Sequence, residues 1–204
     1  MTRESDKPTL VRKIVVVFDI CSSTSLLEDL KSSDNLEHWR DLLIALKEFL
    51  SDQSLRLHFD AYKFIGDGWV LLFPTETSKD GLLDFISGLS AAFYGHFYAQ
   101  VEPFLQSTAG VWGITVGVDS GELIRLEMNE QIEYLGRAIN VATRLQTATK
   151  ELSGGPADKA LFSKNSFNSL GRGRAEFKVR ETKVQLRNIS NGQNYECFQW
   201  DIPL

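Results

Sequence analysis

The sequence has few cysteines and prolines and lacks any long apolar run. Its two cysteines, Cys21 and Cys197, are too few for a disulfide framework and favour a reducing compartment. The N-terminal residues 1–8 are polar and mixed in charge, without the apolar core of a signal peptide. No stretch approaches the roughly 20 apolar residues of a membrane span. We therefore expect a soluble, cytoplasmic protein that does not enter a membrane.

Positive charge is also scarce. The chain has 22 Lys and Arg against 27 Asp and Glu, a formal net charge of -5. Such a chain is poorly suited to bind nucleic acid or anionic lipid, so a polyanionic ligand would need metal ions or a few well-placed cations. The 204 residues, 43% of them hydrophobic, are enough for one substantial core. We predict a polar N-terminal segment, residues 1–11, and a single domain, residues 12–204.

The spacing of apolar residues predicts an α+β fold. Residues 13–20 form a continuous apolar run, typical of a strand covered on both faces. The other predicted elements are helices over 36–50, 81–99 and 137–152, and strands over 56–65, 69–73, 111–118, 122–126, 160–163, 174–179, 183–186 and 195–200, with turns at 66–68, 120–121 and 191–192. Strand, helix, hairpin, helix, strand is the order of a ferredoxin-like α/β sandwich with helices on one sheet face.

Two aspartates occupy costly positions. Asp19 ends the apolar run of residues 14–18, and Asp67 lies at the tip of a predicted hairpin. A carboxylate at the mouth of an apolar strand is unfavourable unless something pairs with it. Two of them on adjacent strands would hold two hard divalent cations about 3.5–4 Å apart, the geometry of phosphoryl chemistry. Taken singly, Asp67 could be a turn residue and Asp19 a helix N-cap. These interpretations explain the two aspartates together less well.

The residues around these aspartates suit a phosphate ligand. Gly66 and Gly68 permit close backbone approach, and the amides from Ile20 through Thr24 would cradle a triphosphate at the start of a helix. The hydroxyls of residues 22–24 are also potential N-caps of that helix. Lys63 shares a strand face with Asp67, although an ordinary strand lysine is the simpler interpretation.

A second group of polar residues lies on a predicted helix. Asn140 and Arg144 are four residues apart and share one helix face, with Arg137 one turn before Asn140. An arginine stabilises oxyanion charge, and a neutral amide orients a ribose oxygen. A solvated polar face is the alternative interpretation of this pattern.

Together these motifs resemble the class III nucleotide cyclase catalytic domain over roughly residues 12–200. The matching segments are 17–20 with Ser23 and Thr24, 63–68, 117–121, and Gly136 with Asn140 and Arg144. The resemblance implies a head-to-tail homodimer with an active site at each of two interfaces. It implies that Asp19, Asp67 and the Ile20 carbonyl bind two Mg²⁺ or Mn²⁺ ions, that Asn140 positions the ribose, and that Arg144 stabilises the transition state. The implied nucleotide-binding residues are Phe18, Ile20, Ser23, Thr24, Lys63, Glu133, Arg137 and Arg187, with Arg125 as a further phosphate contact.

The departures from the family concern the base. Lys63 matches the adenylate pattern, but Glu133 replaces the usual Asp or Thr, and its extra methylene would crowd a purine. Arg137 is long enough to reach the same pocket. In its compact length and its hairpin, this chain resembles the cyclases of Pycsar antiphage systems. The cyclic UMP or cyclic CMP that those cyclases make triggers a downstream effector. We therefore predict a uridylate cyclase that acts on UTP, and keep a soluble adenylate cyclase and a cytidylate cyclase as alternatives.

Two readings outside this group fit the sequence less well. A nucleotide-binding pseudo-enzyme would be expected to lack Asp19, Asp67, Asn140 or Arg144, and all four are present. A palm-type diguanylate cyclase carries Gly-Gly-Asp/Glu-Glu-Phe at the hairpin tip, which residues 65–68 do not match.

Overall fold

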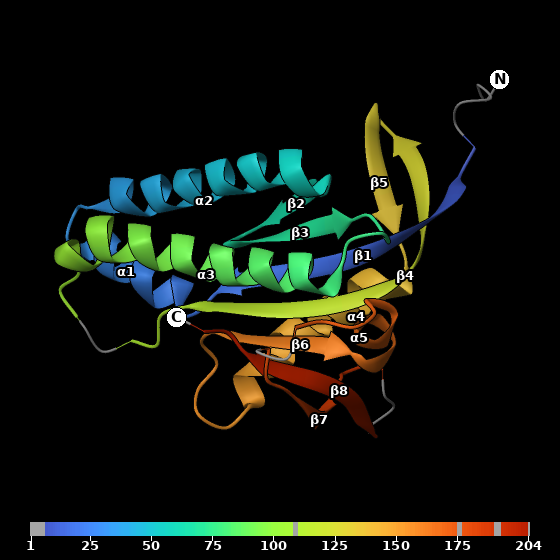
Figure 1. Ribbon diagram of the computed structural model, residues 1–204. Helices are drawn as coiled ribbons and strands as arrows, with labels where there is room; N and C mark the ends of the chain where they lie inside the picture. The colour runs from blue at the N-terminus through green and yellow to red at the C-terminus, as the bar shows by residue number, and fades with distance from the viewer. Residues whose placement is uncertain (1–6, 108–109, 175–176, 190–192, 204) are drawn as a thin grey trace.

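The fold is built on one mixed β-sheet. The computed structural model describes residues 7–107, 110–174, 177–189 and 193–203. Within them the sheet has eight strands in the order β2-β3-β1-β4-β6-β8-β7, with β5 paired to β4 (Figure 1). The strands are β1 (Thr9–Ile20), β2 (Asp60–Ile65), β3 (Gly68–Phe73), β4 (Ile114–Met128), β5 (Gln131–Leu135), β6 (Lys159–Ser163), β7 (Val179–Gln185) and β8 (Asn194–Asp201). The first strand lies beside the hairpin near the sheet centre, as predicted.

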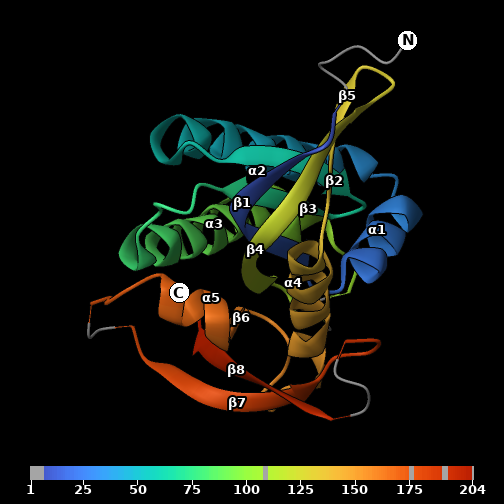
Figure 2. The ribbon, with the colours of Figure 1, turned by 90° about the vertical axis from the view of Figure 1, so that its right-hand side faces the viewer.

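Helices cover both faces of this sheet, and not one face as expected. The helices are α1 (Ser23–Ser32), α2 (Leu36–Leu57), α3 (Lys79–Gln100), α4 (Arg137–Ala148) and α5 (Lys164–Ser169), with short 3₁₀ turns at Glu102–Phe104 and Thr149–Glu151. Helix α4 lies on the opposite side of the sheet from α2 and α3 (Figure 2). Side chains of β1 alternate between the two cores: Val16 and Phe18 pack in the core with α1, α2 and α3, whereas Val15 and Val17 pack against α4. The continuous apolar run of β1 is thus explained by burial on both sides.

Several predicted boundaries were wrong. The strands predicted over 111–118 and 122–126 are one strand, because residues 120–121 pair with β1 instead of turning. The chain turns later, at Asn129 and Glu130, which both have positive φ angles. Helix α2 continues to Leu57, seven residues beyond the predicted end. The helix expected to start near residues 22–24 is α1, a separate helix that ends at Ser32, whereas α5 and the pairing of β5 with β4 were not predicted.

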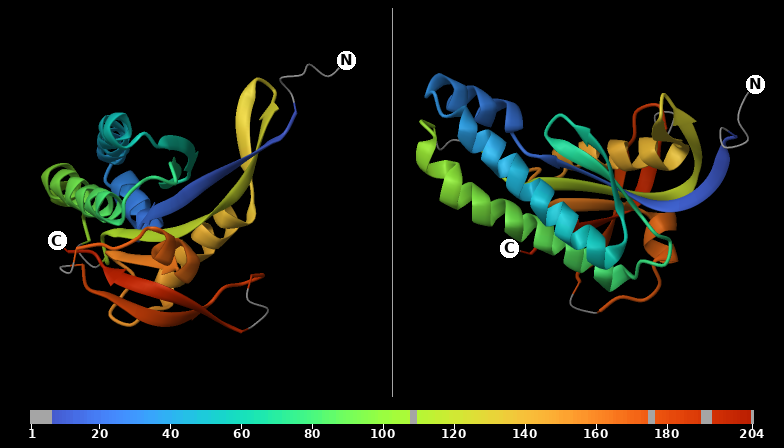
Figure 3. Two further views of the ribbon diagram at one scale, coloured as in Figure 1. Left: turned by 45° about the vertical axis from the view of Figure 1, so that its right-hand side comes forward. Right: turned by 90° about the horizontal axis from the view of Figure 1, so that it is seen from above.

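The ends of the chain differ in smaller ways. Strand β1 begins at Thr9, so residues 9–11 extend the sheet although they were assigned to the polar segment. The strand predicted over 183–186 is part of β7, which pairs antiparallel with β8. The strand predicted over 174–179 includes residues 175–176, which lie outside the described residues. The predicted turn at residues 191–192 lies outside the described residues. None of the helices in the described ranges combines the length and apolarity that a membrane span needs. The β4–β5 hairpin projects from the body of the domain (Figure 3).

Candidate active site

Asp19 and Asp67 lie next to each other where β1 meets the tip of the β2–β3 hairpin. The antiparallel register places Phe18 opposite Trp69 and so brings Asp19 level with Gly68. A Cβ atom on Gly68 would lie 1.9 Å from the carbonyl oxygen of Phe18, so this approach requires a residue without a side chain. Burial, and then the neighbouring Asp67 carboxyl group, raise the pKa of Asp19 to about 7. The structure therefore brings the two predicted metal ligands together.

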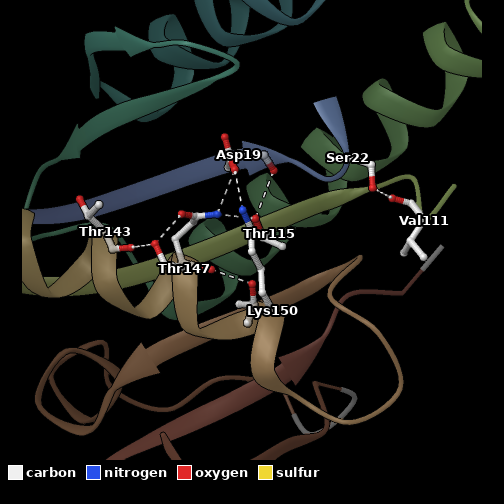
Figure 4. A network of polar contacts seen from close by, with 9 residues as sticks. Asp19, Ser22, Val111, Thr115, Thr143, Thr147 and Lys150 are labelled. Atoms are coloured by element: carbon white, nitrogen blue, oxygen red, sulfur yellow. Dashed lines mark hydrogen bonds and ion pairs between the residues drawn. The ribbon is translucent and has the colours of Figure 1, made fainter. Parts of the chain in front are cut away.

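Asp19 is also held by three residues that sequence reasoning missed. The Gln146 side-chain amide donates to the Oδ2 atom of Asp19 at 3.3 Å, and the Thr115 hydroxyl donates to the main-chain oxygen of Asp19 at 3.3 Å (Figure 4). The Lys150 ammonium lies 3.8 Å from the same Oδ2 atom. Gln146 sits two residues after Arg144 on the same helix, and this proximity to a predicted catalytic residue is the one signal the sequence offered.

The donor set fits a hard divalent cation. Among the described residues no group of three or more His, Cys, Asp or Glu side chains forms a closed metal cage. Two adjacent carboxyl groups and a main-chain carbonyl offer only oxygen, which suits Mg²⁺ or Mn²⁺ and not a thiolate-preferring metal. Magnesium commonly uses one or two carboxylates together with substrate phosphates. The pair is thus adequate for cations delivered with a nucleotide.

The segment after Asp19 begins a helix without a side-chain cap. Ser22 precedes α1 with a left-handed φ of 56°, and no side-chain hydrogen bond caps the helix, so the predicted capping role of these hydroxyls is wrong. The Ser22 hydroxyl instead donates to the carbonyl oxygen of Val111 at 3.2 Å (Figure 4). Ser23 is half-buried and Thr24 is exposed at the start of α1. The Phe18 ring is fully buried, so a nucleotide contact from Phe18 would come from its main chain.

Asn140, Arg144 and Arg187 line one cavity, while their predicted roles stay predictions. Its volume is about 340 Å³, and it is also lined by Thr143, Asn188 and Ile189. The opposite face of α4 is buried on the sheet through residues such as Val141 and Leu145. Arg187 reaches the cavity from the segment after β7, at residues 186–189. The cavity therefore combines an amide and two guanidinium groups beside a helix, a combination suited to phosphate and ribose oxygens.

Lys63 and Glu133, the predicted base-selecting residues, contact each other. The Lys63 ammonium lies 3.2 Å from the Glu133 carboxylate, and the Tyr62 hydroxyl donates a short hydrogen bond to the same carboxylate. These contacts lower the pKa of Glu133. The Tyr62 hydroxyl also accepts a hydrogen bond from the Tyr134 amide at 3.1 Å. Tyr62 was not predicted, because β2 has an irregular register between Ala61 and Lys63 that the sequence does not reveal.

Arg137 and Arg125 occupy different surroundings. Arg137 is exposed at the start of α4, and its charge acts on the carboxyl group of Asp119 and on Tyr195. Among the described residues no ion pair joins Arg137 to the Lys63–Glu133 pair. Arg125 lies on β4 opposite Tyr134 of β5. The predicted contacts of both arginines with a nucleotide stay predictions.

The site residues of one chain form separate groups. Asp19 and Asp67 lie at the end of β1, whereas Asn140, Arg144 and Arg187 line the cavity beside α4. No hydrogen bond or ion pair joins a member of the first group to a member of the second among the described residues. A substrate that touches both groups within a single chain would have to span α4.

The comparisons with known proteins identify the fold. No family profile matches the sequence, and no curated protein matches it significantly. A bacterial light-regulated adenylyl cyclase matches with a TM-score of 0.71 and 19% identity over 96% of this chain, which spans only 53% of that chain. The guanylyl cyclase Cya2 has a TM-score of 0.70, 17% identity and coverage of 96% and 93%. The adenylyl cyclase CyaB from P. aeruginosa has a TM-score of 0.65 and 20% identity, over 94% of this chain and 95% of that chain. The fold is that of class III cyclase catalytic domains, as predicted.

Proposed function

We propose that this chain is a pyrimidine nucleotide cyclase that converts UTP to 3′,5′-cyclic UMP and pyrophosphate. The observation that carries the proposal is the pair Asp19 and Asp67, held together at the end of β1 on a cyclase fold. In the reaction the ribose 3′-oxygen attacks the α-phosphorus. The bond from that phosphorus to the bridging oxygen of pyrophosphate breaks, and the hydroxyl proton passes to solvent.

Two divalent cations, Mn²⁺ or Mg²⁺, would be held by Asp19, Asp67 and the Ile20 carbonyl. When bound, such ions lower the pKa of the 3′-hydroxyl and neutralise triphosphate charge. The protein's own contribution begins with the amides from Ile20 to Thr24 at the start of α1, where main-chain N–H groups can donate hydrogen bonds to an anion. The close approach of β3 to β1 at Gly68 fixes the spacing of the two carboxyl groups.

The residues beside α4 supply the other half of the chemistry. Asn140 would orient the ribose, Arg144 would stabilise negative charge that develops on the α-phosphoryl oxygens, and Arg187 would hold the outer phosphates. Their common cavity supports this division of roles. Because these residues and the aspartates form separate groups within one chain, we infer a head-to-tail homodimer. In it the aspartates of one protomer face the α4 cavity of its partner.

The preference for a pyrimidine rests on Glu133. Its carboxylate is engaged by Tyr62 and Lys63, so the longer acid and its partners occupy space beside the base position. A smaller uracil ring leaves more room for them than adenine does. Lys63 fits an adenylate cyclase equally well, so cyclic AMP production is the alternative, and cytidylate cyclase activity is the closest variant.

The biological role proposed for the product is that of a cytoplasmic second messenger in antiphage defence, which reaches a downstream effector through cyclic UMP. This part rests on the resemblance of the hairpin to the Pycsar cyclases. A direct consequence is that infected cells carrying the active chain accumulate cyclic UMP, whereas cells carrying an Asp67→Asn chain do not.

An activity panel tests the reaction and the base together. Purified protein is incubated with ATP, GTP, CTP or UTP and with Mn²⁺ or Mg²⁺, and the products are separated by chromatography and mass spectrometry. Cyclic UMP as the main product supports the proposal. Mainly cyclic AMP would overturn the pyrimidine preference, and no cyclic product from any nucleotide would overturn the cyclase assignment.

A further inference from the structure

We infer that Gln146 is a positioning residue that orients Asp19 and connects it to the helix carrying Asn140 and Arg144. The inference rests on the proposed function, since it assigns Asp19 to metal binding. It goes beyond that function by adding a residue that touches neither metal nor nucleotide. It also predicts communication between the two active sites of the dimer.

Gln146 is linked to Asp19 by a direct hydrogen bond and by a second route through Thr115. It lies on α4 and is 6% exposed, and its side-chain amide donates both to Oδ2 of Asp19 at 3.3 Å and to the Thr115 hydroxyl at 2.7 Å. The hydroxyl of the fully buried Thr115 in turn donates a hydrogen bond to the main-chain oxygen of Asp19. The side chain of Asp19 is therefore bonded to the Gln146 amide directly, and its main chain is linked to the same amide through Thr115.

This amide has little freedom to move. A Cβ atom on Gly117 of β4 would lie 2.0 Å from the carbonyl oxygen of Ala142 and 2.3 Å from the Gln146 main-chain nitrogen. The α4 backbone thus rests directly on β4, without side chains between them. Because the helix is seated so closely, the position of the Gln146 side chain is set by the position of α4.

The bond to Asp19 leaves room for a cation. A carboxylate has two oxygens with about four acceptor sites, and Gln146 uses one of those on Oδ2. Partners of this kind, which bind a metal ligand and not the metal, typically change metal affinity or activity about 10–100-fold when removed. Lys150 is a weaker competitor, because its side chain is 56% exposed and lies 3.8 Å from Asp19.

The position of Gln146 gives it a second consequence. Arg144 lies two residues earlier on α4 and, in the proposed dimer, serves one active site, while Asp19 serves the other. A shift of α4 when one site closes on its nucleotide is transmitted through Gln146 to the metal carboxylate of the other site. The two sites then differ in metal affinity once one of them is occupied.

The test substitutes Gln146→Met, which keeps an unbranched side chain of similar size but removes the donor. The matched control is Gln199→Leu, another buried glutamine, 3% exposed, whose amide donates to Asp201 on β8. Binding of Mn²⁺ alone is measured by electron paramagnetic resonance of the free ion. The apparent Mn²⁺ requirement and the nucleotide KM of the reaction are measured as well.

We expect Gln146→Met to weaken Mn²⁺ binding about 10-fold or more with little change in nucleotide KM, while Gln199→Leu binds Mn²⁺ like the unaltered chain. If Gln146→Met fails to fold, Thr115→Val serves in its place, with a smaller loss expected because the side-chain bond from Gln146 remains. Unchanged Mn²⁺ affinity in the folded variant would overturn the inference. A chain that binds Mn²⁺ but cyclises no nucleotide would instead overturn the proposed function and leave the binding test intact.

Discussion

The two halves of the candidate site are built in opposite ways. On the metal side, Asp19 is partly buried and is contacted by Gln146, Thr115 and Lys150, which come from α4, β4 and the 3₁₀ turn after α4. On the α4 side, Asn140 and Arg187 are exposed at a cavity of about 340 Å³. If the proposed roles hold, one chain pre-organises its metal carboxylates alone, whereas the residues proposed to bind phosphate become ordered only with a substrate or a partner protomer.

The largest effect is expected on the pre-organised side. Asp67→Asn keeps the size of the side chain but removes the charge that faces Asp19. We expect cyclase turnover to fall below detection, because a neutral amide lacks the negative charge that helps hold a hard divalent cation. Folding should be preserved, since Asp67 lies at a half-exposed hairpin tip. A turnover assay beside a thermal melt checks both statements, and full activity in the variant would remove the two-metal mechanism.

A substitution at the α4 cavity should lower the turnover less than the loss of Asp67. Arg144→Ala removes one donor to the developing charge, so we expect kcat to fall about 10²–10³-fold with a smaller change in KM. The measurement is steady-state kinetics at saturating Mn²⁺. Arg180→Ala is a suitable control, because this arginine pairs with Asp201 on the outer strands, away from the cavity. A change in KM alone would make Arg144 a binding residue and not a catalytic one.

Mixing the two inactive variants sharpens the comparison. If each active site takes aspartates from one protomer and Arg144 from its partner, a heterodimer of Asp67→Asn and Arg144→Ala keeps one intact site. Random exchange of subunits then restores roughly a quarter of the unaltered activity. No recovery after verified exchange would mean that both halves act within one chain, which contradicts the proposed dimer.

A change at Gly68 tests how closely the metal side is packed. A Cβ atom there would overlap the Phe18 carbonyl oxygen, so Gly68→Ala must push β3 away from β1. We expect a loss of about 1–3 kcal/mol in the free energy of unfolding, measured by urea denaturation, together with weaker Mn²⁺ binding. Gly95→Ala is the control: no atom lies within 4 Å of its added methyl group, and it should stabilise α3 by up to about 1 kcal/mol. Equal stability of the two variants would show that the hairpin tolerates displacement.

The sequence indicated the candidate residues of this site, whose chemical roles stay predictions, but not the residues that surround them. Asp19, Asp67, Asn140 and Arg144 were identified because a carboxylate after an apolar strand, or an Asn and Arg at helical spacing, are unusual locally. Gln146 and Thr115 carry no such local signal, because their role depends on the contact between α4 and β4. The helices on both sheet faces were missed for a related reason. An apolar strand reports that both of its faces are buried, but does not say which helix covers each.

The boundaries that failed share a physical cause. Ser120-Gly121 is a sensible turn for an isolated segment, yet β1 offers main-chain partners there and the strand continues. Arg56 and Leu57 were predicted to begin a strand, but they complete the last turn of α2, whose C-cap His58 has a φ of 55°. In both places tertiary contacts outweighed local propensity. The antiparallel pairing of β7 with β8 agrees with the predicted hairpin, because the short runs 183–186 and 195–200 flank the turn signal Asn191-Gly192.

The smallest expected effect concerns the base. Tyr62→Phe removes the hydroxyl that binds Glu133 and leaves the ring packed against Tyr134. Glu133 then keeps only its exposed pair with Lys63, so its carboxylate is less fixed and the space beside the base becomes adaptable. We expect the ratio of kcat/KM for UTP over ATP to change about fivefold, in proportion to one hydrogen bond of about 1 kcal/mol, with Mn²⁺ binding unaltered. Tyr98→Phe on α3 is the control. An equal fall in kcat/KM for both nucleotides would assign Tyr62 to general stability of β2, and would leave base selection to Lys63 and Glu133 alone.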